Sequence, residues 1–139
     1  MRQAVETIAI PTTGRGLYEF TDRVRGLLTG IGMSEGAVTL HVQHTSASLL
    51  IQENADPEVR EDLERFFARI CPDGDPIFQH TYEGPDDMPA HVRTALTSVN
   101  TTIPFKSGVL MLGTWQGLYL WEHRTHPHRR GVIAYFCGE

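Results

Sequence analysis

The chain has 139 residues and a mass of 15.6 kDa, the size of one domain, because single hydrophobic cores stop growing only beyond roughly 250 residues. Apolar residues make up 40% and charged residues 21%, a balance that excludes an intrinsically disordered chain. The net charge of −5 excludes the broad basic surface that supplies most nucleic-acid affinity. We therefore expect a single domain over residues 1–139 that does not bind nucleic acid.

The apolar segments and the cysteines indicate in which cellular compartment the protein is located. The longest apolar run, residues 132–137, is far shorter than the roughly 20 residues that span a bilayer. The N-terminal segment has no apolar stretch of the kind found in secretory signals. Cys71 and Cys137 form no CxxC pair. We expect a cytoplasmic protein without a membrane partner.

The first elements are predicted from their hydrophobic periodicity. Residues 2–10 alternate loosely and predict an opening strand, which Pro11 closes. Apolar residues recur at helical spacing over residues 17–28, and Gly30 and Gly32 end that helix.

Two more strands and a helix follow. Residues 37–43 alternate cleanly, and the apolar segment 48–53 predicts a second strand. Asp56 is a suitable N-cap and Pro57 suits the first helical position, so a helix with an apolar stripe is predicted to run from there to Ile70.

The second half of the chain predicts an α+β fold. Residues 72–87 are loop-like, and a shorter helix is expected from about residue 88 to residue 97. Four strands punctuated by glycines and joined as hairpins are then expected at 100–105, 108–113, 117–123 and 131–137. Because this order contains few βαβ crossovers, we expect a mixed, mostly antiparallel sheet with helices packed on one face.

Three histidines stand where a ligand or a metal ion would bind. His44 ends the strand 37–43 at the rim of its apolar face, although its position alone favours an ordinary hydrogen-bonded histidine at a strand end. His80 and His91 flank an acidic loop, and His91 falls in the first turn of a helix, where the helix dipole favours a neutral imidazole. The alternative is an acidic capping loop with incidental histidines.

Two further segments carry candidate binding residues. Trp115 and Gln116 lie in a turn, where a large aromatic side chain indicates a stacking surface or a subunit contact, unless it folds back over the core. Arg124 begins a basic cluster that suits an anion such as phosphate, unless it is simply a solvated loop. The sequence contains no P-loop and no GxGxxG motif, which excludes common nucleotide-binding classes.

Taken together, these motifs resemble the YjbQ-like family of small proteins. The matching strings cover most of the chain and are GRGLYEFTDRV, QHTSASL, ENADPEVREDLERFF, HTYEGPDDMPAHV and LGTWQGLYLWEHR. The DDMP and EHR strings match the bacterial branch best. The resemblance implies an α+β fold, a homotrimer and a secondary thiamine-phosphate synthase activity. It also implies that His44, His80 and His91 are metal ligands.

The remaining site residues follow from the resemblance and from the chemistry of such reactions. We expect catalytic roles for Glu53, Glu83 and His123, and contacts with a small phosphorylated substrate from Trp115, Gln116, Arg124, Asp86 and Asp87. Three imidazoles favour zinc or another transition metal, whereas carboxylates holding a pyrophosphate favour magnesium. The sequence leaves three functions open: a synthase, a metal-dependent hydrolase of a phosphorylated or amide metabolite, and a non-enzymatic metal- or metabolite-binding trimer.

Overall fold

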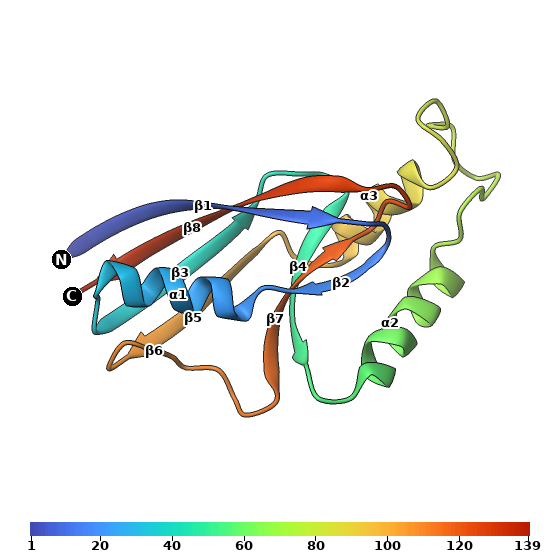
Figure 1. Ribbon diagram of the computed structural model, residues 1–139. Coiled ribbons are helices and arrows are strands. Elements are labelled where there is room, and N and C mark those ends of the chain that lie inside the picture. The colour runs from blue at the N-terminus through green and yellow to red at the C-terminus, as the bar shows by residue number, and fades with distance from the viewer.

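A computed structural model describes residues 1–139 as three helices and two antiparallel sheets (Figure 1), which confirms the predicted α+β class. The five-stranded sheet has the order β1 (Arg2–Thr12), β8 (His128–Gly138), β3 (Glu35–Val42), β5 (Asn100–Lys106) and β6 (Val109–Leu110). The three-stranded sheet has the order β2 (Gly16–Glu19), β7 (Gln116–Glu122) and β4 (Ala47–Glu53). The helices are α1 (Thr21–Ile31), α2 (Pro57–Ile70) and α3 (Asp87–Leu96).

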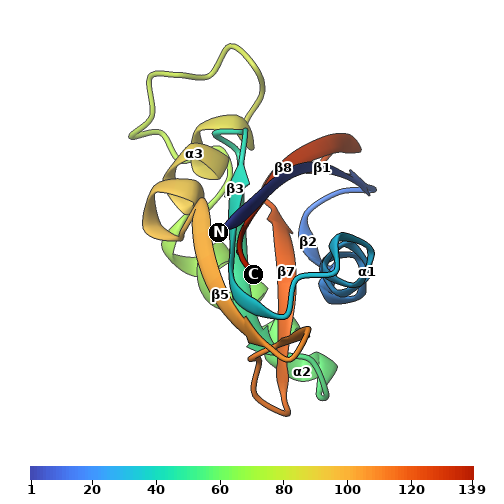
Figure 2. The same ribbon diagram turned by 90° about the vertical axis from the view of Figure 1, so that its left-hand side faces the viewer.

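A single core lies between the two sheets and α1. Alternate residues of the long strands point into it, as in β8, where Val132, Ala134 and Phe136 are buried and the residues between them are partly exposed. The helix α1 adds Val24 and Leu28 from its apolar face. Figure 2 shows α1 on one side of the five-stranded sheet and α3 on the other. No helix is both long enough and apolar enough to cross a membrane.

Two of the segments that cross between the sheets lie against each other at one end of the molecule. Residues 43–46 lead from β3 to β4, and residues 123–127 lead from β7 to β8. The two crossings contact each other, since the amide of His123 donates to the carbonyl of Ser46 at 3.2 Å. The start of α3 reaches the same place, because Asp86 accepts hydrogen bonds from Thr125. Three segments distant in sequence therefore converge at this end.

Two predictions about the elements were wrong. Residues 16–19 are the strand β2, which pairs with β7, so the helix begins only at Thr21. The apolar spacing of Leu17 and Phe20 suits either structure, and pairing with a distant strand decides the outcome. Of the last four strands, only β5 and β6 form a hairpin, because β7 lies in the other sheet. Alternation shows which side chains share a face but does not show which strands pair.

The helix α2 begins as predicted, but its apolar face is only partly buried by the rest of the chain. The Asp56 side chain accepts a hydrogen bond from the amide of Glu58 at 2.9 Å, and Pro57 occupies the first helical position. No residue of α2 is fully buried, and Phe66 and Ile70 of its apolar stripe are exposed. Part of this stripe therefore faces solvent in the single chain.

Candidate metal centre

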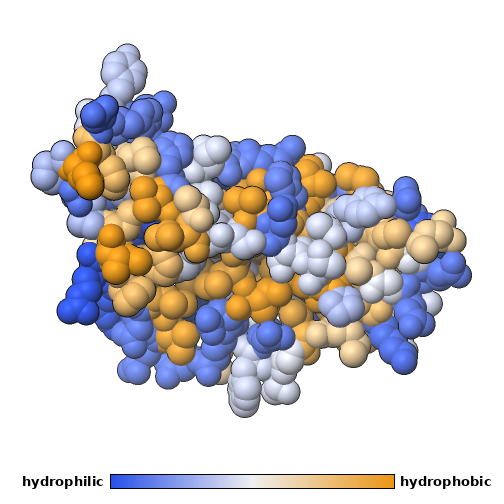
Figure 3. All heavy atoms as spheres, turned by 180° about the vertical axis from the view of Figure 1, so that it is seen from behind, coloured by the Kyte–Doolittle hydropathy of each residue, from blue (hydrophilic) through white to orange (hydrophobic).

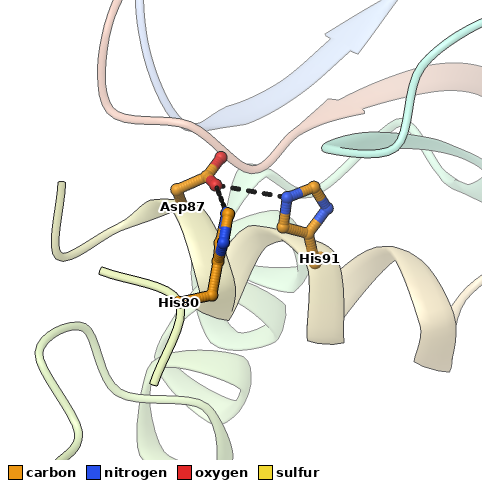
Figure 4. Close-up of side chains that lie close together, drawn as sticks. All are labelled: His80, Asp87 and His91. Carbon is orange, nitrogen blue, oxygen red and sulfur yellow. Dashed lines mark hydrogen bonds and ion pairs between the residues drawn. The ribbon is translucent and has the colours of Figure 1, made fainter. Parts of the chain in front are cut away.

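Two histidines and one aspartate converge at the start of α3. Asp87 and His91 lie one helical turn apart, and His80 reaches them from the preceding connection (Figure 4). The Oδ2 atom of Asp87 lies 2.8 Å from Nε2 of His80 and 3.2 Å from Nε2 of His91. The three candidate ligand atoms all lie within 4.8 Å of one another. These three residues are therefore a candidate site for a small cation.

The hydrogen bond at Nδ1 of His91 determines whether the Nε2 atom of the neutral ring carries a hydrogen or a lone pair. Its Nδ1 atom lies 3.0 Å from the carbonyl oxygen of Thr45, which can only accept, so Nδ1 carries the hydrogen and donates it. In the neutral ring Nε2 then holds the lone pair, and it points at Asp87 Oδ2, a second acceptor. Two facing acceptors attract each other only when a proton or a metal cation lies between them. Metal-binding histidines are oriented in this way by a backbone carbonyl.

Asp87 is buried and is held by Arg124 and two imidazoles. Its side chain is 2% exposed, whereas those of His80 and His91 are 50% and 31% exposed. Burial alone would raise the pKa of Asp87, but the hydrogen bond from His80 and the neighbouring charges lower it overall. Asp87 is therefore a carboxylate across the neutral pH range and faces two partly exposed imidazoles.

All three nitrogen atoms of the Arg124 guanidinium donate hydrogen bonds to acceptors within the protein. Its Nε atom donates to Asp86 at 2.9 Å, its Nη1 atom to Asp87 at 2.8 Å and its Nη2 atom to the carbonyl of Glu83 at 3.0 Å. The amide and hydroxyl of Thr125 add two more hydrogen bonds to Asp86. Burial raises the pKa of Asp86, but Arg124 and Thr125 together hold it well below its ordinary value. In this structure Arg124 therefore orders the loop and Asp87.

His44 lies near this group but outside it. Its Nε2 atom accepts a hydrogen bond from the amide of Gly131 at 2.8 Å, and its Nδ1 atom lies 3.4 Å from Nη1 of Arg130. Burial and the charge of Arg130 lower the pKa of His44. His44 and His91 line a common open groove of about 500 Å³. The structure thus brings together two of the three predicted metal ligands and places the third in the adjoining groove.

A buried ion pair between Arg130 and Glu122 lies next to His44. Arg130 donates through Nε to Oε1 of Glu122 at 2.8 Å and through Nη2 to the hydroxyl of Ser46 at 3.0 Å. Thr12 donates to the same Glu122 oxygen at 2.7 Å. Burial would raise the pKa of Glu122, and the hydrogen bonds from Arg130 and Thr12 lower it overall. The pair joins β1, β7 and β8 to the crossing that carries His44.

The predicted catalytic residues fall in different places. Glu83 is exposed and lies on the connection between α2 and α3, beside the group formed by His80, Asp87 and His91. His123 is fully buried and shares a hydrogen bond of 2.8 Å with Ser48. Glu53 pairs with Gln116 at the far end of β4, six residues from Ala47, which corresponds to about 20 Å along a strand.

Trp115 also lies at that far end of β4 and is 63% exposed. The roles of Glu53, Trp115 and Gln116 stay predictions. Sequence reasoning assigned Asp87 to the substrate and to a magnesium ion holding its pyrophosphate, and not to the metal site of the histidines, although its spacing of four residues from His91 was a usable signal.

The fold and this group define a small α+β protein with a candidate metal centre. The family model described as UPF0047 protein YjbQ-like matches residues 6–139. The UPF0047 protein sll1880 of Synechocystis is 49% identical over 138 residues, which cover 99% of this chain and 94% of that protein. The UPF0047 protein YjbQ of Salmonella typhimurium is 43% identical, over 96% of each chain. The chain therefore belongs to the YjbQ-like UPF0047 family, as the motifs predicted.

Solved structures agree with this assignment. A crystal structure of a YjbQ/UPF0047-family protein from Clostridium acetobutylicum has a TM-score of 0.87 at 28% identity and covers 95% of this chain and 99% of that chain. Relatives also occur in archaea, such as the UPF0047 protein MJ1081 of Methanocaldococcus jannaschii, at 32% identity over 88% of this chain. The family is therefore not confined to bacteria, and placement in a bacterial branch stays a prediction.

Proposed function

We propose that the protein is a metal-dependent enzyme whose ion is held by His80, Asp87 and His91. The observation that carries this proposal is the convergence of three possible ligand atoms, one from each residue, within 4.8 Å of one another. Two imidazoles and one carboxylate form a mixed nitrogen and oxygen set, which zinc and similar transition metals prefer to the all-oxygen set of magnesium.

The spacing of the donor atoms fits an ion of this size. Ligands of a tetrahedral zinc ion lie roughly 3.3 Å apart when each bond is about 2.05 Å long. The two contacts of Asp87 are 2.8 and 3.2 Å, near this spacing, and the half-exposed His80 ring has room to adjust. Because both rings are partly exposed, the ion would keep a position open to solvent, as catalytic zinc sites do.

Hydrolysis of a small metabolite is the reaction that this site supports best. A divalent ion there would supply Lewis acidity and lower the pKa of a coordinated water. Glu83 lies on the loop beside the group and is exposed, so it is placed to accept a proton. A further groove of about 550 Å³, lined by His44 and the exposed Arg129, suits a phosphate on the substrate.

The synthase reaction implied by the family resemblance needs a different site. Pyrophosphate departure is normally assisted by magnesium on carboxylates. Asp86 already accepts three hydrogen bonds, and Asp87 is shared between Arg124 and the histidines. Thiamine-phosphate synthesis therefore stays a prediction, and magnesium-dependent release of pyrophosphate from the two precursors tests it directly.

Turnover by the zinc-loaded protein tests the hydrolase proposal. Wild type is expected to hydrolyse members of a panel of phosphomonoesters and amides with zinc and not after chelation. His91→Ala should lose this activity and Glu83→Gln should lower kcat by about 10²-fold or more. His126→Ala, a change at an exposed histidine outside the group, serves as the matched control. Tight zinc binding without turnover of any panel member would support the non-enzymatic alternative instead.

We also propose a homotrimer, since the single chain leaves two different apolar surfaces uncovered. One is the outer face of the five-stranded sheet, where Val5 lies opposite Tyr135 beside Ile133. Seen from behind, hydrophobic atoms form a broad band across the molecule (Figure 3). The other is the exposed part of the α2 stripe, Phe66 and Ile70.

A ring joins unlike surfaces of neighbouring copies, so two distinct patches suit a cyclic assembly. Light scattering should give about three times the 15.6 kDa of the chain, and Ile133→Glu should lower that mass. A monomeric wild type at micromolar concentration would contradict the trimer.

A further inference from the structure

A second hollow, of about 290 Å³, opens beside His80 on the connection between α2 and α3. Its walls come from residues 74–85 of that connection and from the first turn of α3. They are mainly apolar and include Pro76, Phe78, His80, Pro85, Met88 and Pro89. His80 thus belongs both to this hollow and to the metal group.

The hollow is held open by the fold itself. The amide of Gly74 donates to the carbonyl of Pro85 at 3.0 Å, which ties the two ends of the loop together. Arg15 makes two hydrogen bonds of 2.9 Å to the Asp73 carboxylate, which anchors the loop to the body of the protein. The proline rings fix their own backbone angles. A ligand therefore meets a largely preformed site and pays little to order it.

The lining indicates the chemistry of the occupant. A cavity of about 150 Å³ holds a benzene ring, so roughly twice that volume fits one substituted ring or two fused rings. No lysine or arginine lines the hollow, and its only charged residue is the acidic Asp75, which disfavours an anion. Proline, phenylalanine and methionine side chains offer flat and polarisable contacts for the faces of a ring.

We propose that this hollow is the subsite for a neutral, planar ring of the substrate. The ring packs beside the His80 imidazole, and the reacting group attached to it then lies at the group of His80, Asp87 and His91. This inference rests on the proposed metal-dependent function and adds the class of substrate. The substrate carries a neutral one- or two-ring system next to the bond that reacts.

Indole is a suitable probe because it is neutral, planar and a poor metal ligand. Titrated into ¹⁵N-labelled protein, it should bind saturably in roughly the millimolar range and shift the amide signals of Gly74, Thr81 and Gly84. Met88→Trp should fill the hollow and weaken indole binding at least tenfold. Ile77→Trp is the matched control, because Ile77 lies on the same loop, is 77% exposed and does not line the hollow.

If Met88→Trp does not fold, as judged from the dispersion of its spectrum, Thr81→Trp at the rim replaces it. Equal indole affinity in the filled and control variants would overturn the proposal, as would shifts confined to other surfaces. Repeating the titration with one equivalent of zinc connects the hollow to the metal. Because the ion fixes the shared His80 ring, indole should bind about two- to fivefold more tightly.

An unchanged indole affinity on zinc addition would show that the hollow is not a subsite of the metal centre and would overturn the proposal. Zinc binding is measured on the same samples, so the two failures differ. Zinc binding without indole binding refutes the ring subsite and leaves the metal function intact. Indole binding without zinc binding refutes the metal function, and the role of the hollow as its subsite fails with it.

Discussion

Acid should destabilise this protein through one buried imidazole, that of His123. The side chain lies at the end of β7, has no exposed surface and shares a hydrogen bond with Ser48 through Nε2, while its Nδ1 atom has no partner. Burial, together with the charges of Arg93 and Arg15, lowers the pKa of His123 to about 3. The folded protein therefore keeps this ring neutral far into the acid range.

The sign and size of the effect follow from proton linkage. In the unfolded chain a histidine has a pKa of about 6.5. Between that value and about 3, the unfolded state binds a proton at His123 and the folded state does not. The free energy of unfolding therefore falls as the pH falls through this window. At roughly 1.4 kcal/mol per unit of pKa difference, the loss is about 3 to 5 kcal/mol in total.

Urea unfolding from about pH 7 to about pH 4 measures this contribution. His123→Gln removes the titrating ring and keeps a group that can bond to Ser48, so it should be less stable at neutral pH. The difference in the free energy of unfolding between wild type and His123→Gln should then narrow by about 1 kcal/mol per pH unit on acidification, because only wild type carries the titrating ring. Acidic groups such as Glu122 contribute equally to both proteins. Two curves that stay parallel throughout would refute the reasoning.

Three further outcomes are expected. Arg130→Met leaves Glu122 buried without its cation and should cost about 3–5 kcal/mol in urea unfolding, most of which the added change Glu122→Gln should restore; a loss below about 1 kcal/mol contradicts this. Arg124→Ala removes the group that orients Asp87 and should weaken zinc binding about 10- to 100-fold by calorimetry, so equal affinities would show that Arg124 does not position the site. Zinc affinity should fall as the pH drops, because the ligand atoms of a bound metal ion must be deprotonated. Calorimetry in buffers of different ionisation enthalpy detects the released protons, and a pH-independent affinity would mean that the imidazoles are not ligands.

Local features of this chain were predictable because their signals are local. The start of α2 depends on Asp56 and Pro57 alone, and both act as expected. His80 and His91 lie close together because one short connection and one helix turn join them. The sequence separation of His80 and Asp87 is small, so little of the fold is needed to bring them together.

Features that depend on pairing between distant strands were not predictable from one sequence. The amide that binds His44 belongs to Gly131, 87 residues further along the chain. The separation of Glu53 from the histidines depends on the length and direction of β4, whose two ends lie about 20 Å apart. Period-two patterns identify strands, but they do not place β7 in a different sheet from β8.

The metal content of the purified protein tests the central claim most directly. Wild type without an affinity tag, the double variant His80→Ala/His91→Ala and the control His126→Ala are each dialysed against buffered zinc and assayed by elemental analysis. The structure predicts about one zinc per chain in wild type and in the control, and none in the double variant, with circular dichroism unchanged in all three. A wild type that takes up no metal, or a folded double variant that keeps its zinc, would contradict the account.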